Sequence, residues 1–308
     1  MGATGTDETP SATQSNMHAP LDAHEILHVI HDTRSMERRV AVWSKRVWIG
    51  ATFVGALVCW CIMADHFALT RGVDEYVSLT FNHFALQSGV INHAILIASE
   101  ATVLTGGLLV ALVWVCWFND STRAARERLL VGFGAVLIAV VLSRLLQVSF
   151  PVRLRPMHDL ASGFLPLPGV DPSLANHWGS FPSDHAALFF ALVTVIWHRS
   201  HWLGLLALLS ALYGVLPRLY IGLHYFSDVT AGAVLGVAFV LLFERFGPRT
   251  LASRGVGWEQ RLPGLFYGAA FVLSFEVATL FEDIRQVGRG VPAVLKQLGT
   301  GVVSGLCG

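Results

Sequence analysis

The segment Phe181-Pro-Ser-Asp-His-Ala-Ala-Leu-Phe-Phe-Ala-Leu-Val-Thr-Val-Ile-Trp197 joins a short polar block to an apolar run. Proline restricts the residue before it, and serine is a preferred helix cap, so we expect a helix to begin at Ser183. A helix start presents unpaired backbone N–H groups and the positive end of the helix dipole, which together favour an anion. His185, in the first turn, would stand beside that anion. The segment therefore predicts an anion site where an apolar helix begins.

Two further polar blocks flank this segment. Arg153-Leu-Arg155-Pro precedes it, and Arg218-Leu-Tyr-Ile-Gly-Leu-His224-Tyr-Phe-Ser-Asp228 follows it. Each block lies at the end of a hydrophobic run, so one face of a membrane could gather all three. Together they supply arginines, a serine at a helix start, histidines and a carboxylate. This combination predicts a site for a phosphate.

The composition supports a membrane setting. The chain has 308 residues, of which 54% are hydrophobic and 14% are charged, whereas about 25% charged residues is usual for soluble proteins. The net charge is zero, which gives no basic field for nucleic acid. The four cysteines do not form a disulfide framework, because Cys59 and Cys61 point to different faces of one apolar helix. We therefore expect an integral membrane protein without a nucleic-acid partner.

The apolar runs predict an all-α, polytopic membrane helix bundle with six core spans and a possible seventh. A span needs about 20 residues, and the fourth and sixth runs are shorter. Both begin at a polar block, so their outer turns would line a site rather than face lipid. The runs are 47–64, 94–118, 129–150, 183–197, 202–219, 229–243 and the weaker 265–280.

Basic residues predict the orientation of the spans. Lys and Arg are concentrated in the segments on the amino-terminal side of the membrane, and such segments are usually cytoplasmic. The opposite side carries Arg71 and the three arginines of the polar blocks. We therefore expect a cytoplasmic amino terminus, with the blocks on the periplasmic or outer face of a bacterial inner membrane.

The third block suggests nucleophilic chemistry. His224 and Asp228 are four residues apart, so on a helical turn they share a face and the carboxylate can hold one ring nitrogen. The other nitrogen is then free to act as a nucleophile. Arg218 supplies a planar donor fork for phosphate oxygens, and Gly222 allows a tight turn between them.

The order and internal spacing of these blocks resemble the three-part signature of the type 2 phosphatidic acid phosphatases, which the vanadium haloperoxidases share. The resemblance covers about residues 47–245. It implies a metal-independent phosphatase that works through a phosphohistidine intermediate and needs no cofactor. The matching residues are Arg155-Pro156, Pro182-Ser183-x-His185 and Arg218-x5-His224-x3-Asp228.

The resemblance also implies roles for individual residues. His224 would be the nucleophile, Asp228 its orienting base, and His185 the acid that protonates the leaving oxygen. The phosphoryl oxygens would be held by Arg155, Arg218 and Ser183, together with the backbone that follows Ser183.

Two departures from the family pattern matter for the phosphate. The family usually has Gly where this chain has Asp184, and it has Lys where this chain has Val148. We hypothesise that Arg153 replaces that lysine as a phosphate-binding cation, because it is close to Arg155. Arg144 is the second choice, since side chains on a helix lean toward its start and hence away from the site.

Three alternatives remain open. The protein could be a catalytically impaired membrane protein that binds phosphorylated lipid, because Val148 removes a cation. His24-Glu-Ile-Leu-His28 matches the H-E-x-x-H zinc motif, which would make the protein a zinc peptidase, but it lies in a charged leader, and a surface helix explains it better. Glu100, inside the second run, is either functional or a carboxyl hydrogen-bonded between helices.

We therefore expect an integral membrane lipid phosphatase that hydrolyses a phosphate monoester or diphosphate. Candidate substrates are a polyprenyl diphosphate such as undecaprenyl diphosphate, phosphatidic acid, or phosphatidylglycerol phosphate. Its partners would be the phosphorylated lipid and the membrane. The expected organisation is a disordered leader (1–21), a cytoplasmic surface helix (22–46), the membrane phosphatase domain (47–245), and a cytoplasmic segment with the possible seventh span and tail (246–308).

Overall fold

A computed structural model of the protein describes residues 68–85, 87–149, 153–171 and 179–284, and every regular element in these ranges is a helix. The prediction of an all-α protein is confirmed for this part of the chain. The predicted leader, the surface helix with its H-E-x-x-H sequence and the first apolar run all fall before residue 68, outside the described ranges.

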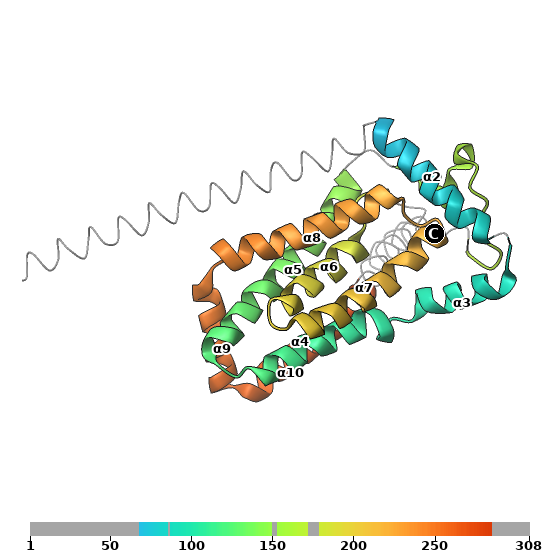
Figure 1. Cartoon of the computed structure of the whole chain (residues 1–308). Coiled ribbons are helices and arrows are strands. Elements are labelled where there is room, and N and C mark those ends of the chain that lie inside the picture. The colour runs from blue at the N-terminus through green and yellow to red at the C-terminus, as the bar shows by residue number, and fades with distance from the viewer. Residues whose placement is uncertain (1–67, 86, 150–152, 172–178, 285–308) are drawn as a thin grey trace, which may run out of the picture. The chain divides into compact units, whose positions relative to one another are not determined.

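Most of the helices follow one another with short connections (Figure 1), but residues 150–183 separate α5 from α6. Two 3₁₀ turns, Pro156–His158 (η2) and Leu160–Ser162 (η3), lie in the loop after the first polar block. A π-helical turn, Val103–Gly107 (η1), joins two of the helices. The α-helices are α2 (Ala68–Ala85), α3 (Gly89–Glu100), α4 (Leu108–Asn119), α5 (Arg123–Ser149), α6 (Asp184–Trp197), α7 (His201–Tyr220), α8 (Phe226–Phe246), α9 (Arg249–Arg261) and α10 (Pro263–Ala278).

Among the described residues, three helices are long and apolar enough to cross a membrane, namely α5, α7 and α8. Gly89–Glu100 and Val103–Asn119 form a pair bent by 55°, which makes a fourth candidate if the pair is one span. The helices α6 and α10 are apolar but shorter. At least three candidate spans are therefore present, and they coincide with the apolar runs of the sequence.

The bend between α3 and α4 has a local cause. The π-helical turn ends in Gly106 and Gly107, and such turns and glycine pairs are common sites of sharp helix kinks. At Gly106 the backbone carbonyl of Ala278, at the end of α10, occupies the space of a side chain. The bend thus allows α10 to pack directly on the chain where α4 begins.

The short helix α6 lies at the centre of the bundle. It packs against α5, α7 and α8 (Figure 1), and most of its residues are buried. Because these four helices run alternately up and down, the end of α5, the start of α6, the end of α7 and the start of α8 lie together. The polar blocks are attached to these four ends.

Glycines on α8 let α6 approach closely. A Cβ at Gly232 would overlap the carbonyl of Ser183, and a Cβ at Gly236 would overlap the carbonyl of Ala187. Backbone atoms cannot move aside as a flexible side chain can. The G-A-V-L-G sequence of α8 therefore brings its first turns against the start of α6, in the manner of small-xxx-small helix pairs.

We expect Gly232→Ala to lower the stability of the fold by about 1–3 kcal/mol, because overpacking against fixed atoms forces the helices apart. Gly268→Ala is the matched control, since a Cβ at Gly268 on α10 meets no atom within 4 Å and alanine is the better helix former by about 1 kcal/mol. Thermal unfolding in one detergent compares the two. Equal melting temperatures would contradict the close contact of α6 and α8.

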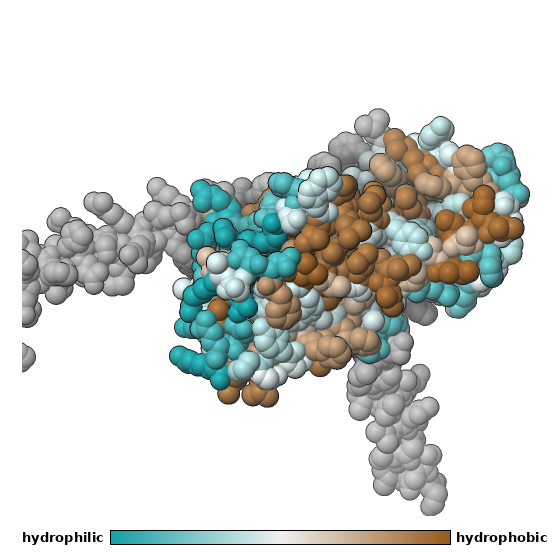
Figure 2. Space-filling view, turned by 60° about the horizontal axis from the view of Figure 1, so that its bottom comes forward, coloured by the Kyte–Doolittle hydropathy of each residue, from teal (hydrophilic) through white to brown (hydrophobic). Residues whose placement is uncertain are grey.

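The surface has the distribution expected of an integral membrane protein. Apolar side chains cover the middle of the face shown in Figure 2, and hydrophilic side chains lie on either side of them. On the helix α7, for example, Leu205, Leu209, Leu212 and Leu216 are exposed. Together with the apolar helices, this belt shows that the protein resides in a membrane.

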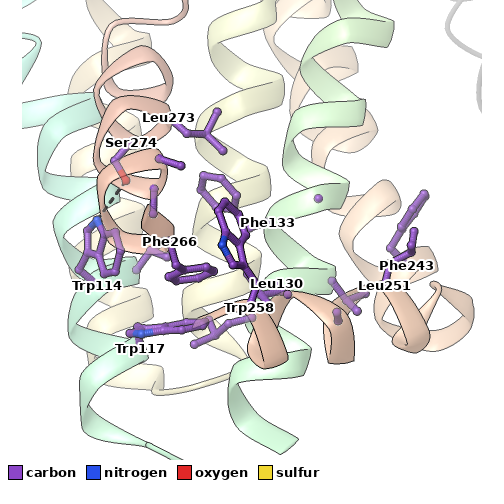
Figure 3. Close-up of a pocket in the computed structure, with 18 of the residues that line it drawn as sticks. Trp114, Trp117, Leu130, Phe133, Phe243, Leu251, Trp258, Phe266, Leu273 and Ser274 are labelled. Carbon is purple, nitrogen blue, oxygen red and sulfur yellow. Dashed lines mark hydrogen bonds between the residues drawn. The ribbon is translucent and has the colours of Figure 1, made fainter. Parts of the chain in front are cut away.

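An apolar pocket lies at the far end of the bundle from the polar blocks (Figure 3). Its volume is about 460 Å³, and it is lined by α4, the first half of α5, the end of α8, α9 and α10. Its lining includes the aromatic rings of Trp114, Trp117, Phe133 and Trp258. Because the polar blocks lie at the opposite ends of α5 and α8, this pocket is separate from the candidate site.

Candidate active site

The three polar blocks meet through backbone hydrogen bonds. Each pair of blocks, or the loops that carry them, shares at least one such bond, so the position of each block depends on the other two. The bonds run from Ser183 N to Asp228 O (3.0 Å), from Ser180 N to Arg153 O (3.1 Å) and from Met157 N to Gly222 O (3.0 Å). The structure therefore brings the three blocks together, from Arg153 to Asp228, which are 75 positions apart and joined by a side-chain hydrogen bond.

A tight turn carries His224 into this cluster. Gly222 follows α7 with a φ of +82°, a backbone conformation that glycine adopts at little cost. A side chain there would also meet the ring of Phe164 at 2.6 Å. The amide groups of Leu223 and His224 bond to the carbonyl of Arg218, at 2.9 and 3.4 Å. The turn thus fixes His224 relative to Arg218, on the last turn of α7.

The ring of His224 is buried and held by a carbonyl. Its Nδ1 lies 2.9 Å from the backbone oxygen of Ser180. Because a carbonyl oxygen can only accept a hydrogen bond, Nδ1 must carry the proton. In the neutral ring the lone pair is then on Nε2, which is the form a nucleophilic histidine needs.

Asp228 is farther from His224 than the sequence predicted. Its Oδ2 lies 3.7 Å from Nδ1 of His224, beyond hydrogen-bonding distance. The prediction assumed that both residues lie on one helix, but α8 begins only at Phe226 and His224 precedes it. Asp228 instead forms a capping box, in which its Oδ2 accepts the backbone N–H of Tyr225 at 2.7 Å.

Arg153 is bound to carboxylates on both sides. Nη1 donates to Asp228 Oδ1 at 2.7 Å, and Nη2 donates to Asp74 Oδ2 at 2.7 Å. The guanidinium also lies 4.2 Å from the centre of the Tyr225 ring, a cation–π contact. Since these contacts occupy both ends of the fork, the geometry does not favour the hypothesis that Arg153 takes the place of the family lysine.

Asp74 connects α2 to this cluster and was not identified from the sequence. It is buried, and its carboxylate accepts hydrogen bonds from the backbone N–H of Ser227 at 2.8 Å and from the hydroxyl of Ser227 at 2.6 Å. With the bond from Arg153, this makes three contacts between α2 and the first and third blocks. Asp74 is one of three acidic residues between two apolar runs, with Asp65 and Glu75, and nothing in the sequence marks it for such a role.

Arg155 is buried beneath the cluster. Its Nη1 donates to the carbonyl of Leu223 at 2.6 Å. Burial lowers the pKa of the Arg155 guanidinium, and the negative charges of Asp184 and Asp228 oppose that shift. An arginine with two nearby carboxylates stays charged. Arg155 therefore places a positive charge next to His224, which follows Leu223.

The second block forms the helix start that the sequence predicted. Ser183 caps α6, its hydroxyl accepting the N–H of Ala186 at 3.4 Å. In the first turn, His185 Nδ1 lies 3.0 Å from Asp184 Oδ1, and Arg144 Nη1 lies 3.7 Å from Asp184 Oδ2. Val148 is 61% exposed and contributes no charge. Of the two candidate cations, Arg144 therefore reaches the second block, whereas Arg153 is held in the third.

The remaining candidates lie elsewhere. Glu100 is exposed at the end of α3. Within the described residues, no group of three or more His, Cys, Asp or Glu side chains is arranged as a metal site. The arrangement of the three blocks consists instead of one histidine with a free Nε2, a second histidine at a helix start, and arginines beside both.

Comparison with known proteins finds relatives of this arrangement. Residues 128–250, which contain all three blocks, match the PAP2 superfamily. Over this segment the chain is similar to members of that superfamily. The PAP2 match and the relatives below indicate phosphatase activity on lipid phosphates.

Curated PAP2 relatives are similar over much of their length. Lipid A 1-diphosphate synthase of Escherichia coli is 26% identical over 199 residues, which cover 59% of this chain and 81% of the relative. Bacitracin transport permease protein BcrC of Bacillus licheniformis is 27% identical over 52% of this chain and 73% of its own. The putative undecaprenyl-diphosphatase YbjG of Escherichia coli is 27% identical over 48% of this chain and 69% of its own.

Proposed function

We propose that this protein hydrolyses the phosphate monoester or diphosphate of a membrane lipid through a phosphohistidine formed on His224, without a metal ion. The observation that carries the proposal is the bond between His224 Nδ1 and the Ser180 carbonyl. In the neutral ring it leaves the lone pair on Nε2. The cap of α6 is joined to the same block through the bond from Ser183 N to Asp228 O, and Arg155 is joined to it through Leu223 O, so a phosphoryl group bound beside these residues would meet a nucleophile.

The reaction follows from these positions. Nε2 of His224 attacks phosphorus, the bond from phosphorus to the leaving oxygen breaks, and the electron pair of that bond stays on the oxygen. His185 donates a proton to this oxygen, and Arg155, Arg218 and Ser183 stabilise the charge on the phosphoryl oxygens. A water molecule then attacks the phosphohistidine and returns a proton to His185. Inorganic phosphate leaves, and His224 is regenerated.

A lipid substrate fits the position of the site. The blocks lie where α5 to α8 end, at one limit of an apolar bundle, so an apolar tail can stay in the bilayer while its head group reaches His224. Two PAP2 relatives carry diphosphate in their names, a lipid A 1-diphosphate synthase and a putative undecaprenyl-diphosphatase. We therefore place polyprenyl diphosphates first among the candidates and phosphatidic acid second.

We propose the orientation and the span count on the same basis. The arginines of α9 lie at the end of the bundle opposite to the site, which agrees with a cytoplasmic amino terminus and an outer-facing site. The bent α3–α4 pair and α5 to α8 give five of the six core spans, and the apolar run 47–64 would be the sixth.

The test is phosphate release in detergent with a chelator present. The panel contains undecaprenyl diphosphate, phosphatidic acid and phosphatidylglycerol phosphate. We expect release to continue in excess chelator and to be inhibited by vanadate, which mimics the five-coordinate phosphorus of the reaction. Release that requires a divalent metal would contradict the mechanism. Binding of these lipids without release would instead support the catalytically impaired alternative.

A further inference from the structure

Asp184 lies between His185 and a cation on another helix. Its Oδ1 accepts hydrogen bonds from both the backbone N–H of His185, at 2.9 Å, and the ring Nδ1 of the same residue, at 3.0 Å. Its Oδ2 faces Arg144 Nη1 at 3.7 Å. Asp184 is itself buried. One carboxylate therefore links the second histidine of the site to α5.

This geometry fixes the orientation of the His185 ring. An oxygen that bonds to the backbone and the ring of one residue leaves that ring little freedom to rotate about χ1 and χ2. A carboxylate that accepts from Nδ1 also sets the proton on that nitrogen, so Nε2 is the nitrogen that exchanges a proton with the substrate. The edge of Phe189, 5.9 Å away between ring centres, packs against the same ring.

The two histidines of the site thus have different partners. A neutral carbonyl holds His224, whereas a carboxylate holds His185. A nucleophile must reach phosphorus as a neutral ring, and an acid must carry a second proton that needs a counter-charge. Asp184 supplies this counter-charge, with its Oδ1 at 3.0 Å from the ring Nδ1 of His185.

Arg144 holds Asp184 in its place. Arg144 Nη1 donates to Gln147 Oε1 at 2.8 Å, and Gln147 Nε2 donates to the carbonyl of Pro182 at 2.5 Å. The helix α5 therefore contacts the second block at two points, one on each side of Ser183. Removal of the Arg144 charge would leave the buried Asp184 without this contact.

We propose that Asp184 is a positioning residue for proton transfer by His185, and that Arg144 keeps its carboxylate in position. The proposal rests on the proposed function and deepens it. When the bond from phosphorus to the leaving oxygen breaks, the proton passes from Nε2 of His185 to that oxygen. The attack of water on the phosphohistidine returns one proton to Nε2. Asp184 exchanges no proton and holds the ring throughout.

The test compares two leaving groups on the same variants. An alkyl phosphate, such as a lipid phosphate, needs a proton on its leaving oxygen, whereas 4-nitrophenyl phosphate leaves as a stable anion. For Asp184→Gly we expect kcat/KM for the alkyl substrate to fall about 10–100-fold, as for the carboxylate partners of metal-bound histidines, and kcat/KM for the aryl substrate to change less than about threefold. The ratio kcat/KM is compared because it reports the steps up to departure of the leaving group, whereas hydrolysis of the phosphohistidine is common to both substrates.

The mechanism also predicts how substitutions combine. Because Asp184 acts through His185, Asp184→Gly should cause no further loss of alkyl turnover in a His185→Ala background. Asp184→Asn keeps the shape of the side chain and removes its charge, so it tests the charge without a loss of packing. Arg144→Ala should act in the same direction as Asp184→Asn, and Arg144→Lys should restore part of the turnover. Arg128→Ala, at the other end of α5, is the matched control and should equal the wild type.

Several outcomes would overturn the proposal while the wild type stays active. These are equal losses for the alkyl and aryl substrates, additive effects of Asp184→Gly and His185→Ala, and wild-type turnover in Asp184→Asn. An Arg144→Ala variant with raised KM and unchanged kcat would make Arg144 a phosphate ligand instead. A wild type that hydrolyses neither substrate would contradict the proposed function itself, which separates the two failures.

Discussion

Replacement of His224 by alanine reduces phosphate release from every lipid substrate by a factor of at least about 10³, because no other group can form the covalent intermediate. The protein should keep its fold, since a smaller side chain leaves the Ser180 carbonyl with space for water. Release from the preferred lipid, measured with chelator present, checks this expectation.

Three controls make the His224 result specific. His93→Ala removes an exposed histidine of α3 and should keep wild-type turnover. Phosphate-labelled substrate should give an acid-labile label on the wild-type protein and no label on His224→Ala. In His224→Gly, added imidazole should restore part of the turnover by filling the vacant space. A label that persists without His224 would assign the nucleophile to another residue.

Replacement of Arg153 by alanine lowers the free energy of unfolding by about 3–5 kcal/mol, the cost of leaving buried charges without their partner. Both Asp74 and Asp228 are buried, and each contacts Arg153 at 2.7 Å. Since folded proteins are stable by only about 5–15 kcal/mol, this is a large loss. A fall in melting temperature, together with loss of phosphate release, is the expected result.

A second substitution distinguishes the roles of Arg153. If the loss arises from unpaired carboxylates, Arg153→Ala with Asp74→Ala should be more stable than Arg153→Ala alone, because one of the two charges is gone. Arg71→Ala, which removes an exposed arginine from the same helix α2, should behave as the wild type. An unchanged melting temperature with a raised KM would instead show that Arg153 binds the phosphate, as the sequence suggested.

The sequence was informative wherever the determinants are local. Apolar runs and their ends predicted α5, α7 and α8 within a few residues, and the serine cap predicted the start of α6. Because each polar block lies at the end of a run, alternation of the helices was enough to predict that the blocks meet. The glycines that bring α6 against α8 form the pattern G-A-V-L-G, but the sequence alone does not show that they pack against α6.

The contacts of the site could not be predicted in the same way. The partner of His224 is the backbone carbonyl of Ser180. Every residue has such a carbonyl, so the sequence does not indicate this contact. His224 and Asp228 lie close together, with 3.7 Å between Nδ1 and Oδ2, but not on one helix, because α8 begins after His224. Arg153 was assigned to phosphate because it is close to Arg155, and its carboxylate partner Asp74 on α2 is remote in sequence.

Asp74 lies outside the segment that carries the family match, residues 128–250, yet it supports residues on either side of His224. Anyone who grafts that segment onto another membrane scaffold would therefore transfer Arg153 and Ser227 without the acid that holds them. The same dependence limits the paths open to mutation. Loss of either charge alone is costly, so Asp74 and Arg153 are expected to change together or to stay unchanged. The segment needed for hydrolysis must therefore extend back to α2.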